Sequence, residues 1–460
     1  MPPRDQLRGA RLAVLRPRGR AMNVRALGLR AGAVEQAPEV SGPDAEEGSP
    51  QLPSRRLRRR WMWLAVAIGP GLMVMLADTD AGSVVTAAQS GARFGYRLLP
   101  LEVLLIPVLY LVMELTVRLG LTTGKGHAEL IKARFGRGWA VFSVSTLLVT
   151  SVGALVTEFA GIAGVGSIAG LPPQLIVPGA AIVLLLVVVS GSYRRVELIG
   201  IGFGLFELAF LVAAIRAHPD PGSLVGSLGM GQPLGNSAYL ALVAANVGAV
   251  VMPWMIFYQQ AAILDKGITV RDLRFARINT AIGAVVTQVI MIAVLVATGA
   301  SLFHRHSGSL NTVAQISTAL TSSLGAAGGR LAFAMGVAGA ALVAALVVSL
   351  GAAWAFAEVA GKPRSLNRKF RQEPLFYGVF IGAVGLSAVL VLTSSSLVGL
   401  AIAVEILNAL LLPIVLVFLI VLAWTTLPAP FRLRLWEKVV LIVVTAMVVG
   451  MGAALIVTSL

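Results

Sequence analysis

The sequence predicts an all-α protein that crosses a membrane many times. Of its 460 residues, 57% are hydrophobic and only 13% are charged. Apolar runs of about 20 residues recur from residue 62 to the C-terminus, and each is long enough to span the hydrocarbon core as a helix. The lysines and arginines concentrate in alternate connections between these runs, which is the charge pattern of a polytopic membrane protein.

Eleven apolar runs predict eleven transmembrane helices. If the N-terminus is cytoplasmic, nineteen Lys and Arg residues fall in the inside connections and five in the outside ones. This bias fits the positive-inside rule and places the C-terminus outside, because an odd number of spans separates the termini. The predicted spans cover residues 62–90, 98–117, 139–169, 172–190, 196–215, 237–263, 277–302, 331–358, 376–395, 397–424 and 436–459.

Residues 1–60 differ in composition and are expected to form a disordered, basic cytoplasmic tail. They hold thirteen arginines against six acids and no apolar run long enough for a signal peptide. A transit peptide is the alternative, weakened by the acids between Glu35 and Glu47. The run RRLRRR at 55–60 contains no aromatic residue, so we interpret it as a contact with the lipid bilayer and expect no nucleic-acid partner.

Two of the predicted spans contain residues that interrupt a helix near their middle. The first, AVAIGPGLMVMLADTDAGSVVTAAQSG, has Asp78 and Asp80 followed by Gly82. The sixth, ALVAANVGAVVMPWMIFYQQAA, has Gly248 and Pro253. Glycine permits non-helical backbone, and proline removes a helical hydrogen bond. A five-helix unit repeated once returns with inverted topology, so paired interruptions in the first and sixth spans indicate a binding site near the membrane midplane.

The two carboxylates favour a cation at this site. Ordinary kinks are the alternative for the interruptions, but a kink does not explain charges that each cost at least about 2.5 kcal/mol at that depth. A Na⁺- or H⁺-coupled symporter of a small organic solute on the same fold is the alternative function. We expect no enzyme, because Asp78 and Asp80 share one helix, whereas intramembrane aspartyl proteases need acids on two. The sequence has no cysteine, which excludes thiolate metal sites.

Three stretches resemble the NRAMP (natural resistance-associated macrophage protein) family of divalent-metal transporters. They are GPGLMVMLADTDAGSVVTAAQSGARFGY in the first span, VRLGLTTGKGHAEL at 117–130 and NVGAVVMPW at 246–254. The resemblance covers residues 62–424 and implies a LeuT-like transporter domain over 61–460. Spans 1–5 (61–215) and 6–10 (237–424) are then inverted repeats with broken helices 1 and 6, and 436–459 is an eleventh helix.

The resemblance also implies the function and the ligands of the metal. It implies import of Mn²⁺ or Mg²⁺, with Fe²⁺ as a further candidate, across the plasma membrane by alternating access. The metal is the substrate, and no cofactor is expected. By position, the implied metal ligands are the Asp80 carboxylate, the Ser83 hydroxyl, the Ala249 carbonyl and the Met252 sulfur. A thioether favours softer ions such as Mn²⁺ and Fe²⁺ over Mg²⁺.

Several positions depart from the family pattern and point to its magnesium and manganese branch. Ser83 stands where the family has Asn, and Trp254 where it usually has His. In the third span Glu158 matches a family acid, whereas Gly161 stands where a second acid often lies. Because acids and histidines form proton relays, we expect weak or absent proton coupling, with protons kept as a candidate partner.

Five residues are candidates for an outer-shell or pathway role, namely Trp254 and Glu158 together with Asp78, Glu405 and Asn408. Asp78 has no counterpart among the family's ligands, and it lies two residues before Asp80. Glu405 and Asn408 lie one helical turn apart in the tenth predicted span, near a position that is polar in the family. The other acids within the spans are expected to be neutral or paired structural groups.

Overall fold

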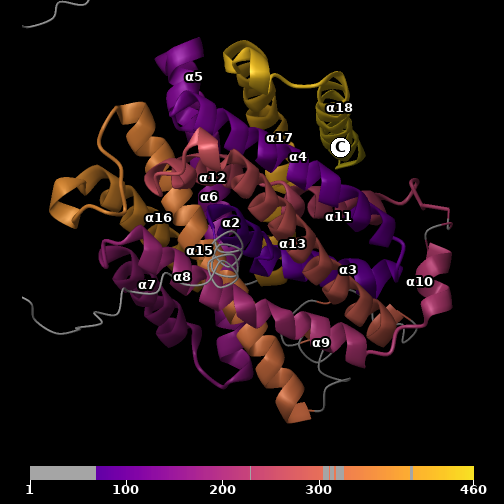
Figure 1. Ribbon diagram of the computed structural model, residues 1–460. Helices are drawn as coiled ribbons and strands as arrows, with labels where there is room; N and C mark the ends of the chain where they lie inside the picture. Colours follow the sequence, from indigo (N-terminus) through magenta and orange to yellow (C-terminus); the bar gives the residue numbers. More distant parts are fainter. Residues whose placement is uncertain are drawn as a thin grey trace, which may run out of the picture. The chain divides into compact units, whose positions relative to one another are not determined.

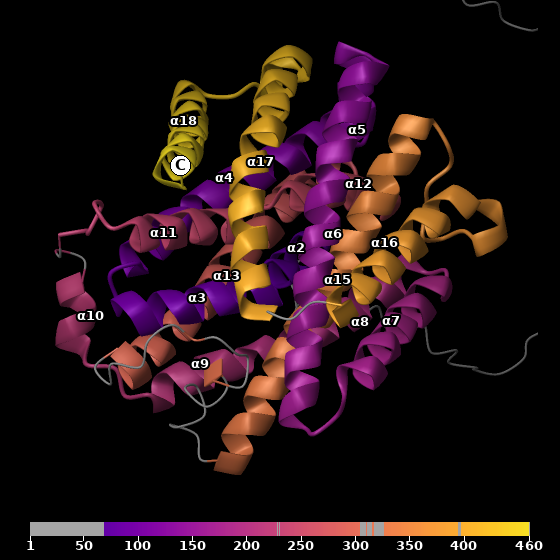
Figure 2. The same cartoon turned by 180° about the vertical axis from the view of Figure 1, so that it is seen from behind.

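Helices account for nearly all of the chain that the computed structural model describes, namely residues 69–227, 229, 231–303, 310, 315–316, 326–393 and 397–459 (Figures 1 and 2). The predicted tail at 1–60 lies outside these residues. The first half contains α2 (Pro70–Asp78), α3 (Ala81–Phe94), α4 (Leu99–Thr123), α5 (His127–Phe135), α6 (Arg137–Ile168), α7 (Pro173–Val189), α8 (Tyr193–Gly204), η1 (Leu205–Glu207), α9 (Leu208–Arg216) and α10 (Pro221–Ser227).

The second half is built in the same way from long apolar helices. It contains α11 (Ser237–Val250), α12 (Pro253–Asp265), η2 (Val270–Asp272), α13 (Leu273–Leu302), α15 (Ala326–Ala360), η4 (Phe370–Gln372), α16 (Pro374–Thr393), α17 (Leu397–Thr426), η5 (Ala429–Phe431) and α18 (Leu435–Ser459).

Eight helical segments of the described chain are long and apolar enough to cross a membrane. Two of them join shorter helices, α8 with α9 and α11 with α12. The apolar helix α7 has 17 residues, which is shorter than these eight. The prediction of an all-α membrane protein is therefore confirmed, whereas the count of eleven spans stays a prediction.

Helical geometry is interrupted at both positions where the sequence places Gly and Pro beside polar groups. α2 ends at Asp78 and α3 begins at Ala81, with Thr79 and Asp80 between them. α11 ends at Val250 and α12 begins two residues later, at a proline. Proline suits the first position of a helix because the N–H that it lacks has no helical acceptor there.

The interrupted helices lie inside the bundle. α2 contacts α8, α12, α13 and α15, and in both views it is enclosed by other helices (Figures 1 and 2). Every residue of α2 except Leu72 is buried, as are residues 81–92 of α3. Polar side chains in this segment are consequently shielded from lipid by protein.

α17 packs against both interruptions at glycines. A Cβ on Gly248 of α11 would meet the carbonyl oxygen of Glu405 and lie 2.9 Å from the backbone nitrogen of Ala409. A Cβ on Gly82 of α3 would meet the Glu405 carboxylate. Glycine is thus required at these two positions by the close approach of α17 rather than by its own backbone angles.

The basic connections predicted to lie inside contact one another. Arg364, in the α15–α16 connection, pairs with Glu129 of α5 at 2.7 Å. Lys266, after α12, pairs with Glu197 of α8 at 2.7 Å. The first pair joins two connections that the charge pattern assigns to the inside, and the second joins such a connection to the start of α8.

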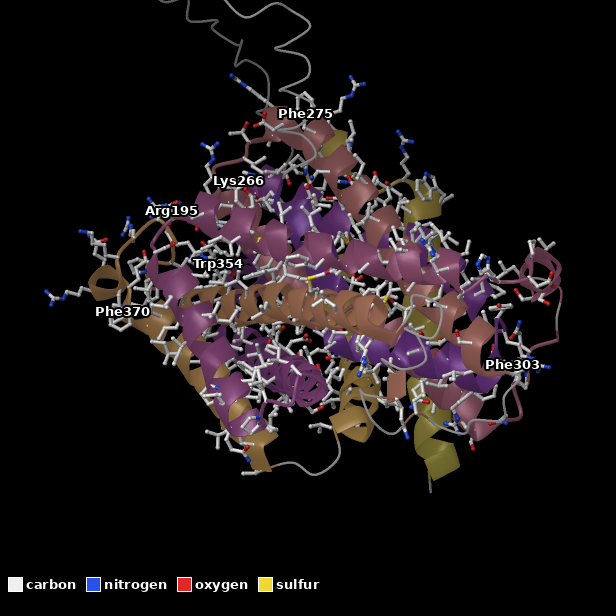
Figure 3. All side chains as sticks on the ribbon, turned by 90° about the horizontal axis from the view of Figure 1, so that it is seen from below. Arg195, Lys266, Phe275, Phe303, Trp354 and Phe370 are labelled. Carbon is white, nitrogen blue, oxygen red and sulfur yellow. The ribbon has the colours of Figure 1, made fainter. Side chains whose placement is uncertain are left out.

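Figure 3 shows the same grouping among the labelled side chains. Arg195 near the start of α8, Lys266 after α12 and Phe370 of η4 lie toward one side of the bundle, whereas Phe303 at the end of α13 lies toward the opposite side. The labelled basic residues thus lie on one side of the bundle.

The close contact at Gly248 predicts a strong effect of one methyl group. Gly248→Ala should lower the thermal unfolding midpoint of the detergent-purified protein, because overpacking against α17 backbone costs about 1–3 kcal/mol. Gly382→Ala in α16 is the matched control, since a Cβ there has no atom within 4 Å. A Gly248→Ala protein as stable as the Gly382→Ala protein would contradict this packing.

Candidate metal site

Asp80 lies between α2 and α3 and caps the N-terminus of α3. Its φ of −68° and ψ of 174° are extended, and its Oδ1 accepts a hydrogen bond from the Ser83 backbone N–H at 2.6 Å. A helix N-terminus favours a negative group, which stabilises the ionised carboxylate. Oδ2 is buried without a hydrogen-bond partner among the described residues. One oxygen is therefore fixed by the helix, and the other remains available.

Ser83 connects the two interrupted segments. Its Oγ donates a hydrogen bond to the carbonyl oxygen of Ala249 at 3.2 Å. That carbonyl has no donor in its own helix, because the residue four positions later is Pro253, which lacks an N–H. The sequence thus leaves an acceptor at the end of α11 that points to the N-terminus of α3.

Met252 and Trp254 form a pair at the start of α12. Met252 precedes the helix with φ −95° and ψ 142°, and Trp254 Nε1 donates a hydrogen bond to its sulfur at 3.2 Å. Both side chains are fully buried. The tryptophan that replaces the family's usual histidine therefore acts as a donor toward the predicted sulfur ligand, a contact that the sequence analysis did not predict.

Glu158 reaches the same place from α6. Its Oε2 accepts a hydrogen bond from the Ala81 N–H at 3.1 Å, so it satisfies a second donor at the start of α3. Gly161 lies one turn further along α6, where an added Cβ would be 2.5 Å from the Cβ of Ala81. The position at which the family often has a second acid is thus occupied by direct packing of α3 against α6.

Glu405 lies closer to the site than the sequence indicated. Its Oε2 accepts a hydrogen bond from Asn408 Nδ2 at 3.0 Å, and its Oε1 has no partner among the described residues. Because the carboxylate lies against Gly82, α17 contributes an acid to the interruption in the first span. Both residues are pathway candidates from the sequence, but no sequence pattern indicates this contact.

Asp78 is the last residue of α2 and is 1% exposed. Neither of its carboxylate oxygens has a hydrogen-bond partner in the described part of the chain. The charged groups that act on it most strongly are other acids, including Asp80 and Glu405. The same holds for Glu158 and Glu405, whose strongest charged neighbour is Asp80.

The described contacts therefore bring buried negative charge together with neutral oxygen groups, whereas the hydrogen bond of the Met252 sulfur is with Trp254 and none among the described residues joins it to Asp80, Ser83 or Ala249. Buried carboxylates without basic partners need a bound cation or protons to balance their charge. Within the described residues, no three His, Cys, Asp or Glu side chains converge as a metal site of their own. A cation at this place would depend on one or two carboxylates supplemented by hydroxyl, carbonyl and thioether groups.

The other buried acids within the predicted spans behave differently from one another. Glu114 pairs with Arg118 and with Arg277, and Glu358 accepts backbone hydrogen bonds at the start of α5. Both fit the expectation of paired structural groups. Glu207, at the junction of α8 and α9, is fully buried, its carboxylate oxygens have no hydrogen-bond partner among the described residues, and Thr79 and Asp80 are the groups that act on it electrostatically. It belongs to the surroundings of the site, although its sequence context gave no sign of this.

Comparisons of the sequence with curated proteins identify transporters. The chain is 30% identical over 264 residues to the "divalent metal cation transporter MntH" of Chromohalobacter salexigens and 32% identical over 250 residues to that of Yersinia pestis. These matches cover 54% and 52% of this chain and 59% of each relative, so the matched stretch spans less than two thirds of these relatives.

Comparisons with solved structures identify the fold. A crystal structure of a manganese transporter of Eremococcus coleocola matches with a TM-score of 0.67 at 17% identity, covering 85% of this chain and 86% of that one. Mhp1, a nucleobase-cation-symport-1 family transporter, matches with a TM-score of 0.56 at 14% identity, covering 85% and 90%. The predicted LeuT-like fold class is thereby confirmed.

The family comparison covers most of the chain. Residues 71–458 match the family described as natural resistance-associated macrophage protein-like. This range includes both interruptions and every residue of the candidate site. The resemblance drawn from the three sequence stretches is confirmed, and the protein belongs to the NRAMP family.

Proposed function

We propose that the protein is a secondary transporter that imports divalent metal cations across the plasma membrane by alternating access. The observation that carries the proposal is the arrangement at the start of α3. Asp80 Oδ1 accepts from Ser83, Ser83 donates to the Ala249 carbonyl, and Asp80 Oδ2 is left without a hydrogen-bond partner among the described residues. No ion pair within that part of the chain involves the neighbouring buried acids, which are Asp78, Glu158 and Glu405. Relatives named as divalent metal cation and manganese transporters support Mn²⁺ as a substrate, with Mg²⁺ and Fe²⁺ as further candidates.

The proposed topology has eleven transmembrane helices. α2 with α3 opens the first inverted repeat, α11 with α12 opens the second, and α18 is the added eleventh helix. The two interruptions support this arrangement because each lies in the first span of its repeat. The ion pairs among the basic connections support a cytoplasmic N-terminus and an outside C-terminus.

The proposed ligands are Asp80, Ser83, Ala249 and Met252. The carboxylate neutralises part of the metal's charge, while the hydroxyl and carbonyl oxygens replace part of its water shell. The hydrogen bond from Trp254 uses one lone pair of the Met252 sulfur and leaves a second for a soft ion. We assign Asp78, Glu158, Glu405 and Asn408 to the outer shell or the pathway, where the acids increase the local negative potential.

Transport of a small organic solute driven by Na⁺ or H⁺ is the alternative. The fold alone does not separate the two, since Mhp1 shares it. The unpaired acids favour a cation, because an anionic or zwitterionic substrate requires helix N-termini free of bare carboxylates. Uptake of Mn²⁺ compared with uptake of amino acids in proteoliposomes distinguishes these functions.

Removal of the Asp80 charge should abolish Mn²⁺ uptake. Asp80→Asn keeps an oxygen that can accept from the Ser83 N–H, so the cap and the fold should persist while the ion loses its counter-charge. Asp272→Asn is the matched control, because Asp272 also accepts backbone and hydroxyl hydrogen bonds near a helix start but is exposed and remote. Wild-type uptake by a monodisperse Asp80→Asn protein would refute the site. Ser83→Ala should reduce Mn²⁺ uptake less than Asp80→Asn, because water can replace a hydroxyl.

Removal of the Met252 sulfur should change selectivity rather than binding in general. Met252→Leu keeps the volume of the side chain, so it should weaken Cd²⁺ and Mn²⁺ binding several-fold while leaving Mg²⁺ binding near wild type. Met255→Leu, at an equally buried methionine one turn away, controls for packing. Calorimetry that shows the same loss for all three ions would assign Met252 to packing alone.

Uptake should be electrogenic and largely independent of protons. Trp254 and Gly161 leave out two titratable groups, and Glu158 already accepts a backbone hydrogen bond. A membrane potential contributes about 4.6 kcal/mol to a dication at 100 mV, which supports accumulation on the order of a thousandfold. Liposomes with an interior pH dye test this. Acidification that scales with Mn²⁺ uptake and vanishes in Glu158→Gln would show proton coupling.

A further inference from the structure

A polar cleft of about 310 Å³ lies where α4 and α13 meet the N-terminal end of α18. Four arginines and two glutamates line it, which leaves a formal surplus of two positive charges. Its wall also includes Trp436, which is 54% exposed. Exposed tryptophan beside basic residues is typical of the membrane–water interface.

The two acids of this cleft are already neutralised. Glu114 and Glu437 both pair with Arg118, which is 4% exposed, and Arg277 Nε lies 2.6 Å from Glu114. This buried network fixes the floor of the cleft. The surplus charge therefore resides on the exposed rim, in the short connection between η5 and α18.

Arg432 and Arg434 form that rim. Both are exposed, and neither side chain makes a hydrogen bond or ion pair within the part of the chain that the structure describes. By the charge pattern, this end of the bundle faces the cytoplasm, where the membrane leaflet carries anionic lipids. The rim thus offers two guanidinium groups to an anion at headgroup depth.

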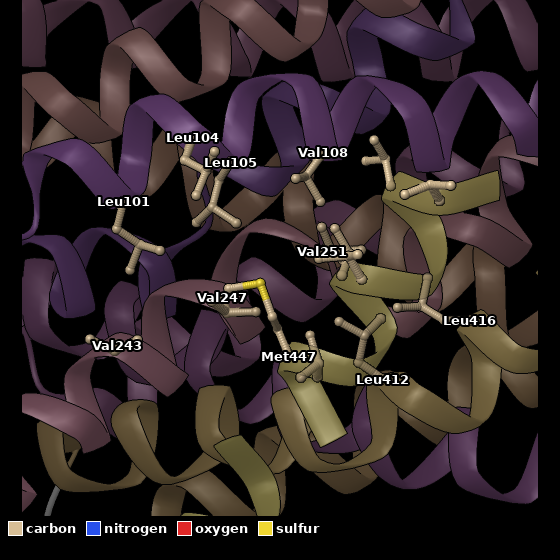
Figure 4. Close-up of a pocket in the computed structure, with 15 residues that line it drawn as sticks. Leu101, Leu104, Leu105, Val108, Val243, Val247, Val251, Leu412, Leu416 and Met447 are labelled. Atoms are coloured by element: carbon tan, nitrogen blue, oxygen red, sulfur yellow. The ribbon is translucent and has the colours of Figure 1, made fainter. Parts of the chain in front are cut away.

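A second cavity, of about 420 Å³, lies between α4, α11, α17 and α18. Figure 4 shows its walls, with Leu101 to Val108 of α4 on one side and Met447 of α18 near Val247 on the other. All fifteen lining residues are Leu, Val or Met. Such walls give water no hydrogen-bond partners, so the cavity suits a hydrocarbon chain.

The polar cleft and the apolar cavity follow one another along α4 and α18. On α4 the apolar lining ends at Val108 and the polar lining begins at Tyr110; on α18 the polar lining ends at Glu437 and the apolar lining begins at Val439. From Arg118 back to Val108, where the apolar lining of α4 begins, the helix rises about 15 Å. This distance lies within one leaflet, which measures roughly 20–23 Å with its headgroups.

We propose that this groove is a binding site for one anionic phospholipid, with its phosphate at Arg432 and Arg434 and an acyl chain in the apolar cavity. Charge and length together select this occupant. A second copy of the chain would bring a like-charged rim to the same place, and residues 1–60 are themselves strongly basic. The proposal does not rest on metal transport.

Equilibrium binding of fluorescent phosphatidylglycerol and phosphatidylcholine to the full-length protein in neutral detergent tests the site. We expect saturable one-to-one binding of phosphatidylglycerol. Joint Arg432→Gln and Arg434→Gln substitution should weaken it about thirtyfold. Joint Arg194→Gln and Arg195→Gln substitution removes the same charge from exposed positions of α8. It should change the affinity for phosphatidylglycerol less than twofold.

A second arm tests the acyl chain and the source of the phosphate. Met447→Trp should fill the apolar cavity and weaken phosphatidylglycerol binding at least tenfold, while glycerol phosphate, which has no chain, should compete only weakly. Four outcomes would overturn the proposal: equal binding of the two lipids, equal losses in both arginine pairs, glycerol phosphate competing as well as the lipid, or a dimer whose interface covers the groove. None of these four outcomes needs a transport assay to be observed.

Discussion

One constraint governs the centre of this protein. Its buried carboxylates have other carboxylates as their strongest charged neighbours. Asp78 of α2, Asp80 of the α2–α3 break, Glu158 of α6 and Glu405 of α17 are all buried inside a bundle that shields them from lipid, although no three of these described acids converge as a metal site. A dry interior does not stabilise such charges, so the fold must supply either protons or a mobile cation. The backbone N–H groups of Ala81 and Ser83 at the start of α3 and the amide of Asn408 offset part of this negative charge. The proposed substrate offsets the rest.

The interrupted helices follow from the same constraint. An unbroken helix satisfies its own backbone groups and has none to offer, whereas a break exposes N–H groups at one end and carbonyls at the other. Pro253 is the residue that makes the Ala249 carbonyl available, and Asp80 is the residue that begins the next helix. Glycines at 82 and 248 then allow α17 to approach both breaks closely.

Much of this arrangement could be predicted from the sequence, because hydrophobic length and charge alternation act locally. The interruptions fell inside the two predicted spans, but Gly82 and Gly248 were predicted to interrupt the helices and are themselves helical; the breaks lie at residues 79–80 and 251–252. Asp80, Ser83 and Ala249 do come together. The second span was predicted to end at 117, but α4 continues to Thr123, where Gly124 adopts the left-handed conformation and stops it. The short helices α5 and α10 were missed because they lie in polar connections without a spanning apolar run.

The contacts that the sequence could not give are those between distant residues. Glu405 lies 323 positions from Gly82, and only the packing of α17 brings them together. The absence of an acid at Gly161 looked like the loss of a proton station, whereas the structure shows a methyl group of Ala81 at that place. The sequence shows that Trp254 stands at a position where histidine is usual. The hydrogen bond from its indole to the Met252 sulfur depends on a side-chain rotamer, which no sequence pattern encodes.

The position of the breaks has a consequence for how binding and motion are connected. Only Thr79 and Asp80 separate α2 from α3, and only Val251 and Met252 separate α11 from α12, so any swing of one half-helix against the other must be absorbed in these four residues. Two of them, Asp80 and Met252, are proposed ligands. The hinges and the proposed coordination sphere then share two residues, so a swing that opens the protein to one side would also move two ligands of the ion. Under the proposed function, the swing of the half-helices would itself promote release of the ion.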